Sequence, residues 1–265
     1  MKSTEFNSES DNNWALILGG SSGLGLATAM KLAKHGMHIA IIHRNARNQM
    51  KEIDLSFKKI AETGIQFVSY NIDATNAEKR SDVLKDLCEK EIKVKVLVHS
   101  IAKGNLKPML ANENPTLAND DFALTINAMA ISLYDWVKQL YVSNLFHDES
   151  SVLSFTSEGS QRAWSNYAAV SAAKASLEAI TRSIALEFAP KGIRANCIQA
   201  GVTDTISLRM IPGSEKLIEH TKIRNPFKRL TQPEDVANAA YLLCKKEASW
   251  INGSIIKVNG GEHIN

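Results

Sequence analysis

Residues 14–25 read Trp14-Ala15-Leu16-Ile17-Leu18-Gly19-Gly20-Ser21-Ser22-Gly23-Leu24-Gly25, and this stretch decides the fold of the chain. A short apolar run typical of a buried strand leads into a glycine-rich turn, after which apolar residues recur at helical spacing until Gly36. At such a junction the backbone amides and the positive end of the helix can bind a pyrophosphate. The spacing Gly-x-x-x-Gly-x-Gly departs from the dinucleotide fingerprint Gly-x-Gly-x-x-Gly, and packing of a tight turn is the alternative interpretation.

The same alternation of short apolar strands and amphipathic helices continues along the chain. Further strands are predicted at 38–42, 66–72, 94–98, 151–155, 193–198 and 254–258, and helices at about 24–35, 48–63, 76–90, 119–143, 166–189 and 233–245. Such alternation indicates a parallel sheet. No linker or repeat divides the chain, so we expect seven strands in a single α/β domain, residues 13–265, after a flexible arm at 1–12. An irregular stretch at 200–230 interrupts the alternation, and long insertions of this kind are often lids.

The composition argues against several functional classes. The 31 basic and 28 acidic residues leave a net charge of +3, spread along the sequence without the basic stripe typical of nucleic-acid binding. The three cysteines form no CxxC pair and the seven histidines show no ligand spacing, so we expect no metal site. The sequence shows neither a signal peptide nor an apolar run of membrane-spanning length, which favours a cytoplasmic protein without membrane contact.

Tyr167 and Lys174 are the most informative pair of polar residues. At about 100° per residue, seven steps return to nearly the same face of a helix, so a phenol and an ammonium would share one surface. Beside a cofactor cleft, the lysine can hold a sugar hydroxyl while the tyrosine stabilises charge developing on a substrate oxygen. A half-buried tyrosine with a nearby solvated lysine is the structural alternative.

The end of the second predicted strand bears on which dinucleotide would bind. It reads Ile42-His43-Arg44-Asn45 and carries no carboxylate to accept the ribose hydroxyls of NADH. Arg44 offers a planar cation suited to a 2′-phosphate. The sequence therefore predicts NADPH rather than NADH, with an exposed loop arginine as the alternative.

Together these features resemble the short-chain dehydrogenase/reductase family from about residue 13 to the end of the chain. The resemblance rests on the glycine turn, on Asp73 where the family contacts adenine, on His99-Ser100-Ile101-Ala102, and on Val258-Asn259-Gly260-Gly261. The His-Ser-Ile-Ala segment replaces the family's usual Asn-Asn-Ala-Gly, and Val170 occupies the usual Tyr position four residues before Lys174. In both departures the sequence resembles the enoyl-acyl-carrier-protein reductase branch, whose signature is a Tyr followed by six residues and then Lys. Ser157, in place of a second Tyr, is similar to the NADPH-dependent subgroup of that branch.

The resemblance implies a Rossmann-type doubly wound parallel sheet with helices on both faces. It also implies NADPH-dependent reduction of the 2,3 double bond of enoyl thioesters in fatty acid synthesis, with Tyr167 stabilising the enolate and Lys174 holding the nicotinamide ribose. The expected partners are an enoyl thioester on acyl carrier protein or CoA, and three further copies of the chain in a homotetramer. The implied cofactor contacts are Gly19, Ser21, Ser22, Gly23, Leu24, Gly25, His43, Arg44, Asn45, Asp73, Ala74, Ser100, Ile101, Ala102, Lys174, Gly201, Val202 and Thr205.

The candidate substrate contacts are Ser157, Ala102 and Met210. Ser157 and Thr156 either hydrogen-bond near the substrate carbonyl or simply end a strand. The insertion at about 203–228 covers the acyl chain or, alternatively, forms two amphipathic helices packed on the core. Lys216, Lys222 and Arg224 would face an acidic carrier protein unless they are solvated charges. The rival activities are a carbonyl reductase for 3-oxoacyl or other ketone substrates, a dienoyl thioester reductase, and a dinucleotide-sensing protein without catalysis.

Overall fold

A single sheet of seven parallel strands forms the centre of the molecule. The computed structural model describes residue 6 and residues 12–112, 115–211 and 213–265. The strand order is β3-β2-β1-β4-β5-β6-β7, so the winding direction reverses between β1 and β4. The strands are β1 (Trp14–Leu18), β2 (His38–His43), β3 (Phe67–Asn71), β4 (Val94–His99), β5 (Phe146–Ser157), β6 (Ile193–Ala200) and β7 (Ile255–Val258). The prediction of a seven-stranded Rossmann-type sheet is confirmed.

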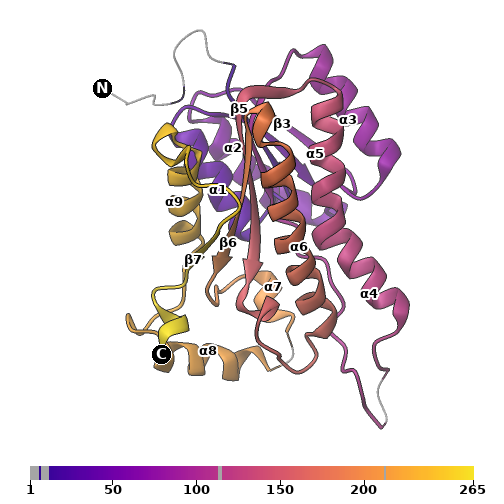
Figure 1. Cartoon of the computed structure of the whole chain (residues 1–265), viewed down its shortest axis with the longest axis vertical. Coiled ribbons are helices and arrows are strands. Elements are labelled where there is room, and N and C mark those ends of the chain that lie inside the picture. Colours follow the sequence, from indigo (N-terminus) through magenta and orange to yellow (C-terminus); the bar gives the residue numbers. More distant parts are fainter. Residues whose placement is uncertain (1–5, 7–11, 113–114, 212) are drawn as a thin grey trace.

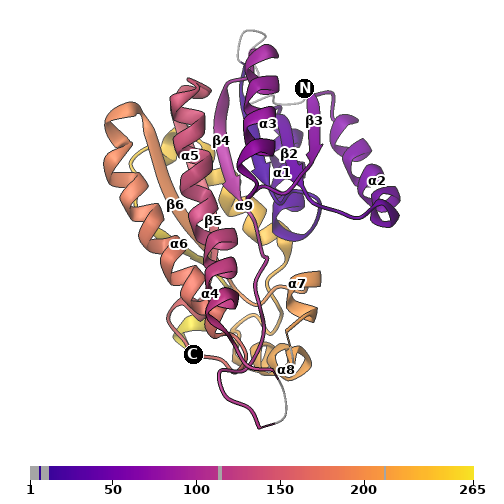
Figure 2. The same ribbon diagram turned by 90° about the vertical axis from the view of Figure 1, so that its right-hand side faces the viewer.

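Helices cover both faces of the sheet because its strands are apolar on both sides (Figures 1 and 2). In β1, Ala15 and Ile17 join the core formed with α1, α2 and α9, whereas Leu16 and Leu18 join the core formed with α3, α5 and α6. The helices are α1 (Gly23–Lys34), α2 (Met50–Ala61), α3 (Ala77–Glu89), α4 (Asn119–Ile126), α5 (Ser132–Val142), α6 (Ala168–Glu187), α7 (Ile206–Arg209), α8 (Ser214–Arg224) and α9 (Pro233–Cys244). Within the described ranges, no helix combines the length and apolarity needed to cross a lipid bilayer.

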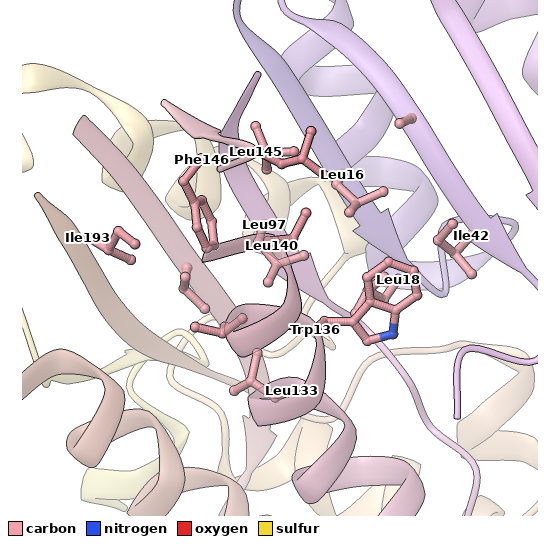
Figure 3. Packing of buried hydrophobic residues seen from close by; sticks show 14 of the residues in the cluster. Leu16, Leu18, Ile42, Leu97, Leu133, Trp136, Leu140, Leu145, Phe146 and Ile193 are labelled. Carbon is pink, nitrogen blue, oxygen red and sulfur yellow. The ribbon is translucent and has the colours of Figure 1, made fainter. Parts of the chain in front are cut away.

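Trp136 on α5 is the largest fully buried side chain, and it packs toward Leu18 and Ile42 at the ends of β1 and β2 (Figure 3). Its indole Nε1 donates a hydrogen bond to the carbonyl oxygen of Ala74 at 2.9 Å. Ala74 lies just after β3, so this bond fixes a loop at the carboxyl edge of the sheet. Core packing thereby helps to position the wall of the cavity described below.

The long helix predicted at 119–143 contains a π-helical turn, Asn127–Ile131, between α4 and α5. Ser132 closes this turn: its backbone N–H reaches the carbonyl of Asn127, and its hydroxyl donates to the carbonyl of Ala128 at 2.8 Å. A serine hydroxyl that bonds a carbonyl one turn earlier competes with the regular helical ladder. Hydrophobic spacing carries no signal for such a turn, and turns of this kind are frequent at functional sites.

One further segment differs from its predicted form. β5 begins at Phe146 rather than at 151, and its first residues went unpredicted because residues 147–150 lack the apolar pattern and bulge out of the pairing with β4. The irregular insertion, for which two amphipathic helices were one alternative, contains α7 and α8, which lie beyond the carboxyl ends of the strands (Figure 1). Of the predicted flexible arm, Phe6 packs edge-on against Tyr241, with ring centroids 5.9 Å apart. The remainder of the arm before Asn12 lies outside the described residues.

Candidate active site

A cavity of about 570 Å³ opens along the carboxyl edge of the sheet. It runs from the turn after β1, past the ends of β2, β3 and β4, to the ends of β5 and β6, and α7 and α8 form its outer wall. In open α/β sheets, this edge is where ligands bind, beside the point at which the strand order reverses. Groups of three or more His, Cys, Asp or Glu side chains able to hold a metal ion are absent from the described residues.

The glycine turn forms the end of the cavity nearest to α1. Gly19 donates from its backbone N–H to the carbonyl of Ile42 at 2.8 Å and has a φ of 84°, a conformation that favours glycine. A Cβ on Gly19 would lie 2.5 Å from the carbonyl oxygen of Ser100, and one on Gly25 would lie 2.3 Å from that of Gly19. The turn therefore approaches β4 and α1 more closely than any side chain would allow. Its backbone and the N-terminus of α1 form a cradle suited to a phosphate.

Opposite charges gather at the ends of β2 and β3. Arg44 Nη1 lies 2.7 Å from Asp73 Oδ2, and Lys103 Nζ lies 3.5 Å from the same oxygen. The other oxygen of Asp73 accepts hydrogen bonds from the backbone N–H and the hydroxyl of Thr75. Partial burial favours a higher pKa for Asp73, but the Thr75 hydrogen bonds and the charges of Lys103 and Arg44 outweigh it and lower the pKa to about 2. Asp73 is therefore a fixed carboxylate with two cations beside it.

Tyr167 and Lys174 both line the cavity at its other end. Asn166 adopts a φ of 62°, a left-handed conformation that asparagine tolerates, so α6 begins at Ala168, two residues later than predicted. Tyr167 directly precedes the helix, and its ring packs against Trp164 and Gly159. A Cβ on Gly159 would lie 2.6 Å from Tyr167 Cε1, so the glycine leaves room for the ring.

Burial controls the charge of the polar groups around Lys174. It lowers the pKa of Lys174 to about 8 and raises the pKa of the Tyr167 phenol, because the charged form of each group loses its water. His99, at the end of β4, is fully buried, and burial together with the charge of Lys174 lowers its pKa to about 3. His99 is therefore neutral. Its Nε2 lies 2.8 Å from the Oγ atom of Ser132, the residue that closes the π-helical turn.

Ser157 at the end of β5 faces Tyr167. Burial raises the pKa of Tyr167 and the nearby Ser157 hydroxyl acts against that rise, but the geometry between the two groups falls short of a hydrogen bond. Ser157 Oγ is thus buried without a hydrogen-bond partner among the described residues. Thr156 differs, because its hydroxyl is buried and donates to Glu178 Oε1 at 2.6 Å. Of these two neighbours, Ser157 is the one with a hydroxyl free for a ligand.

The family model described as Enoyl-(Acyl carrier protein) reductase matches residues 19–263, from the glycine turn to the last helical turn. The chain belongs to the short-chain dehydrogenase/reductase family. It is similar to the enoyl-acyl-carrier-protein reductase branch of this family, as predicted from the Tyr-to-Lys spacing. It is an oxidoreductase of the short-chain dehydrogenase/reductase type.

Similar members of the family carry more than one chemistry in their names. The 7alpha-hydroxysteroid dehydrogenase of Escherichia coli K12 is 29% identical over 263 residues, 97% of each chain. The peroxisomal 2,4-dienoyl-CoA reductase of Mus musculus is 27% identical over 250 residues, 93% of this chain and 82% of that protein. The crystal structure of enoyl-[acyl-carrier-protein] reductase (NADH) from Aquifex aeolicus VF5 has a TM-score of 0.83 at 25% identity and covers 96% of this chain and 97% of that one.

In this member of the short-chain dehydrogenase/reductase family, the cavity brings together nearly all of the predicted site residues. The predicted cofactor contacts other than Gly25, the pair Tyr167 and Lys174, and the candidate substrate contacts Ser157, Ala102 and Met210 all line its wall. Gly25 does not line the cavity and instead packs closely against the carbonyl oxygen of Gly19 in the glycine turn.

Arg224 fits neither alternative, a contact with a carrier protein or a solvated charge. Its side chain is only 15% exposed, and Nη2 lies 2.9 Å from Glu158 Oε2 and 3.0 Å from Glu262 Oε1. Arg224 thus ties the end of α8 to the loop after β5 and to the C-terminal turn. Lys216 and Lys222, on the same helix, are exposed.

Several cavity residues escaped prediction. Lys103 follows the His-Ser-Ile-Ala segment directly, so its position after β4 was a usable signal. Glu158 and Glu262 also line the cavity. Both accept a hydrogen bond from Arg224, which is distant from both in sequence. No local pattern indicates that such a contact exists.

Proposed function

We propose that this protein reduces the 2,3 double bond of enoyl thioesters with NADPH as the hydride donor. The observation that carries the proposal is the position of the phenol. Tyr167 lines the cavity seven residues before Lys174, while buried Val170 fills the position four residues before it and has no group able to hydrogen-bond an oxygen. A thioester oxygen lies farther from the hydride-accepting carbon of an enoyl group than a ketone oxygen does from its own carbon. The greater Tyr-to-Lys separation suits that longer reach.

The residues along the cavity fit a dinucleotide. The glycine turn leaves a backbone cradle that a Cβ would fill, and Arg44 after β2 and Lys103 after β4 offer two cations beside Asp73. Lys174 Nζ donates to the carbonyl of Phe155 at 2.6 Å, and a lysine ammonium has further N–H groups for ribose hydroxyls. When bound, NADPH would supply the hydride to the β-carbon of the enoyl group, and a proton from water would complete the reduction at the α-carbon.

The side chains at the other end of the cavity support the reaction electrostatically. Tyr167 Oη donates a hydrogen bond to the thioester oxygen as negative charge collects there, and the charge of Lys174 favours the same enolate. Ser157 Oγ, which has no partner among the described residues, is a second candidate donor to that oxygen. The apolar side chains of Met210, Ile211 and Leu217 on the outer wall would exclude water from the acyl chain.

Side-by-side assays test this function. We expect oxidation of NADPH with crotonyl-CoA and with a longer 2-enoyl thioester, and little with acetoacetyl-CoA or a ketosteroid. The same enoyl group on acyl carrier protein and on CoA would identify the natural carrier, and a 2,4-dienoyl-CoA would detect dienoyl reduction. Preference for a ketone would reject enoyl reduction in favour of carbonyl reduction. Tight NADPH binding without turnover of any of these compounds would favour a dinucleotide sensor.

Replacement of Arg44 tests the choice of NADPH over NADH. Its guanidinium is paired with Asp73, so a 2′-phosphate would take over an arginine already placed at the cavity. Arg44→Ala is expected to raise the KM for NADPH by about 10- to 100-fold and to leave the KM for NADH nearly unchanged. Steady-state kinetics with both cofactors measure this ratio.

Arg47→Ala is the matched control, because Arg47 is exposed in the same loop and does not line the cavity. Comparable KM values for NADPH and NADH in the unmodified protein would contradict the proposed preference for NADPH. That preference would distinguish this chain from the Aquifex aeolicus reductase, whose name gives NADH.

We also propose assembly as a homotetramer through the face formed by α4, α5 and α6. Apolar side chains stand exposed along this face, with Leu124 at 62%, Val142 at 70% and Leu186 at 78% exposure. Exposed apolar patches of this kind are typical of subunit interfaces. Light scattering coupled to size-exclusion chromatography measures the mass directly.

A further inference from the structure

Lys174 and Glu178 lie one turn apart on α6, and both side chains are buried. Neighbouring residues of β5 hold them: the carbonyl of Phe155 accepts a hydrogen bond from Lys174 Nζ, and the hydroxyl of Thr156 donates to Glu178 Oε1, each at 2.6 Å. The strand therefore fixes an ammonium and a carboxylate side by side, although no ion pair within 4.0 Å joins them directly. An isolated charge is costly to bury, so this arrangement calls for a compensating partner.

The other titratable groups around Lys174 carry no compensating charge. Cys197 on β6 lies close to it, but burial raises the pKa of that thiol above its ordinary value, so the thiol is neutral when Lys174 titrates. His99 on β4 and Tyr167 before α6 are also neutral near pH 8. Glu158, in the loop after β5, is already paired with Arg224 and Arg162. Among the described groups, Glu178 is the carboxylate left to balance the ammonium.

We infer that Glu178 is a positioning residue that keeps Lys174 charged and directed into the cavity. It does not line the cavity and acts through Lys174 alone. The inference rests on the proposed role of Lys174 in holding the cofactor, and it adds a determinant of the pH range in which that role is possible. Removing the carboxylate should allow the buried ammonium to lose its proton at a lower pH.

The pH dependence of NADPH binding tests this role without any assumption about the substrate. The Kd is measured between pH 6 and 9.5 by the fluorescence of bound NADPH, for the unmodified protein, Glu178→Gln and Glu178→Asp. Affinity should fall as the pH rises through about 8 in the unmodified protein. The midpoint should shift downward by about one pH unit in Glu178→Gln, which keeps the shape but not the charge. Glu178→Asp keeps the charge, so its midpoint should lie close to that of the unmodified protein.

Glu187→Gln is the matched control, because it removes the same charge from an exposed position on the same helix and should leave the midpoint unchanged. An unchanged midpoint in Glu178→Gln would overturn the inference. If that variant does not fold, Lys174→Met/Glu178→Gln, which buries neither charge, should fold. Failure of both variants to fold would assign Glu178 a purely structural role and also overturn the inference.

The same measurements separate this inference from the proposed function. Pyridine nucleotide binding with an alkaline midpoint, but with no shift in Glu178→Gln, would reject the role of Glu178 and leave the proposed cofactor site intact. A protein that binds neither NADPH nor NADH would reject the proposed function, and the role of Glu178 would fail with it.

Discussion

Tyr167→Phe is expected to lower kcat with an enoyl thioester by about 10²- to 10³-fold, the usual cost of removing one donor to a developing oxyanion. The Kd for NADPH should stay nearly the same. Phenylalanine keeps the ring that packs against Trp164 and beside Gly159, so the substitution removes only the hydroxyl. The structure records no hydrogen bond of sound geometry from that hydroxyl to a described residue, and the thermal midpoint should therefore change little.

Tyr70→Phe is a matched control for loss of a phenol. Tyr70 Oη donates to Asp86 Oδ2 at 2.5 Å in a partly buried contact between β3 and α3, and Tyr70 does not line the cavity. This variant should lose stability and keep its kcat, the reverse of the pattern expected for Tyr167→Phe. Single-turnover rates, equilibrium NADPH binding and thermal unfolding distinguish the two patterns. Turnover like that of the unmodified protein in Tyr167→Phe would refute the mechanism.

The fold was predictable because its signals are local. Residues 14–25 combine an apolar strand, a glycine turn and a helix start in one continuous stretch, and the same rhythm recurs along the chain. The failures occur where structure depends on contacts distant in sequence. Ser150, in the polar start of β5, pairs with Ile193 of β6, and Ser132, which closes the π-helical turn, has its hydroxyl 2.8 Å from His99 Nε2 on β4.

The site shows the same division. The spacing of Tyr167 and Lys174 predicted that they would share one surface, and both line the cavity, although Tyr167 directly precedes α6 rather than lying within it. Arg224 was misjudged because a charge on an amphipathic helix looks solvated until the residues facing it are known. Glu178 follows Lys174 at a spacing of one helical turn, but the sequence alone does not indicate that both side chains are buried. Burial converts an ordinary i,i+4 pair into one that sets a charge state.

Lys174→Met should weaken NADPH binding by about 10- to 100-fold, because the ammonium is proposed to hydrogen-bond the nicotinamide ribose. It should lower kcat as well, since the positive charge also favours the enolate. The pKa of about 8 for Lys174 means that the ammonium is present below this pH and the neutral amine above it. Affinity in the unmodified protein should therefore fall as the pH rises through 8. Methionine has no charge to lose, so the variant should bind equally weakly on both sides of that pH.

Lys191→Met provides the comparison, because Lys191 is exposed just after α6 and lies away from the cavity. It should retain the affinity and the alkaline midpoint of the unmodified protein. Thermal unfolding must accompany the measurement, since Lys174→Met leaves Glu178 buried with only Thr156 as a recorded hydrogen-bond partner. A folded Lys174→Met variant with the original alkaline midpoint would show that another group titrates there. The assignment of the cofactor lysine would then be wrong, whatever double bond the enzyme reduces.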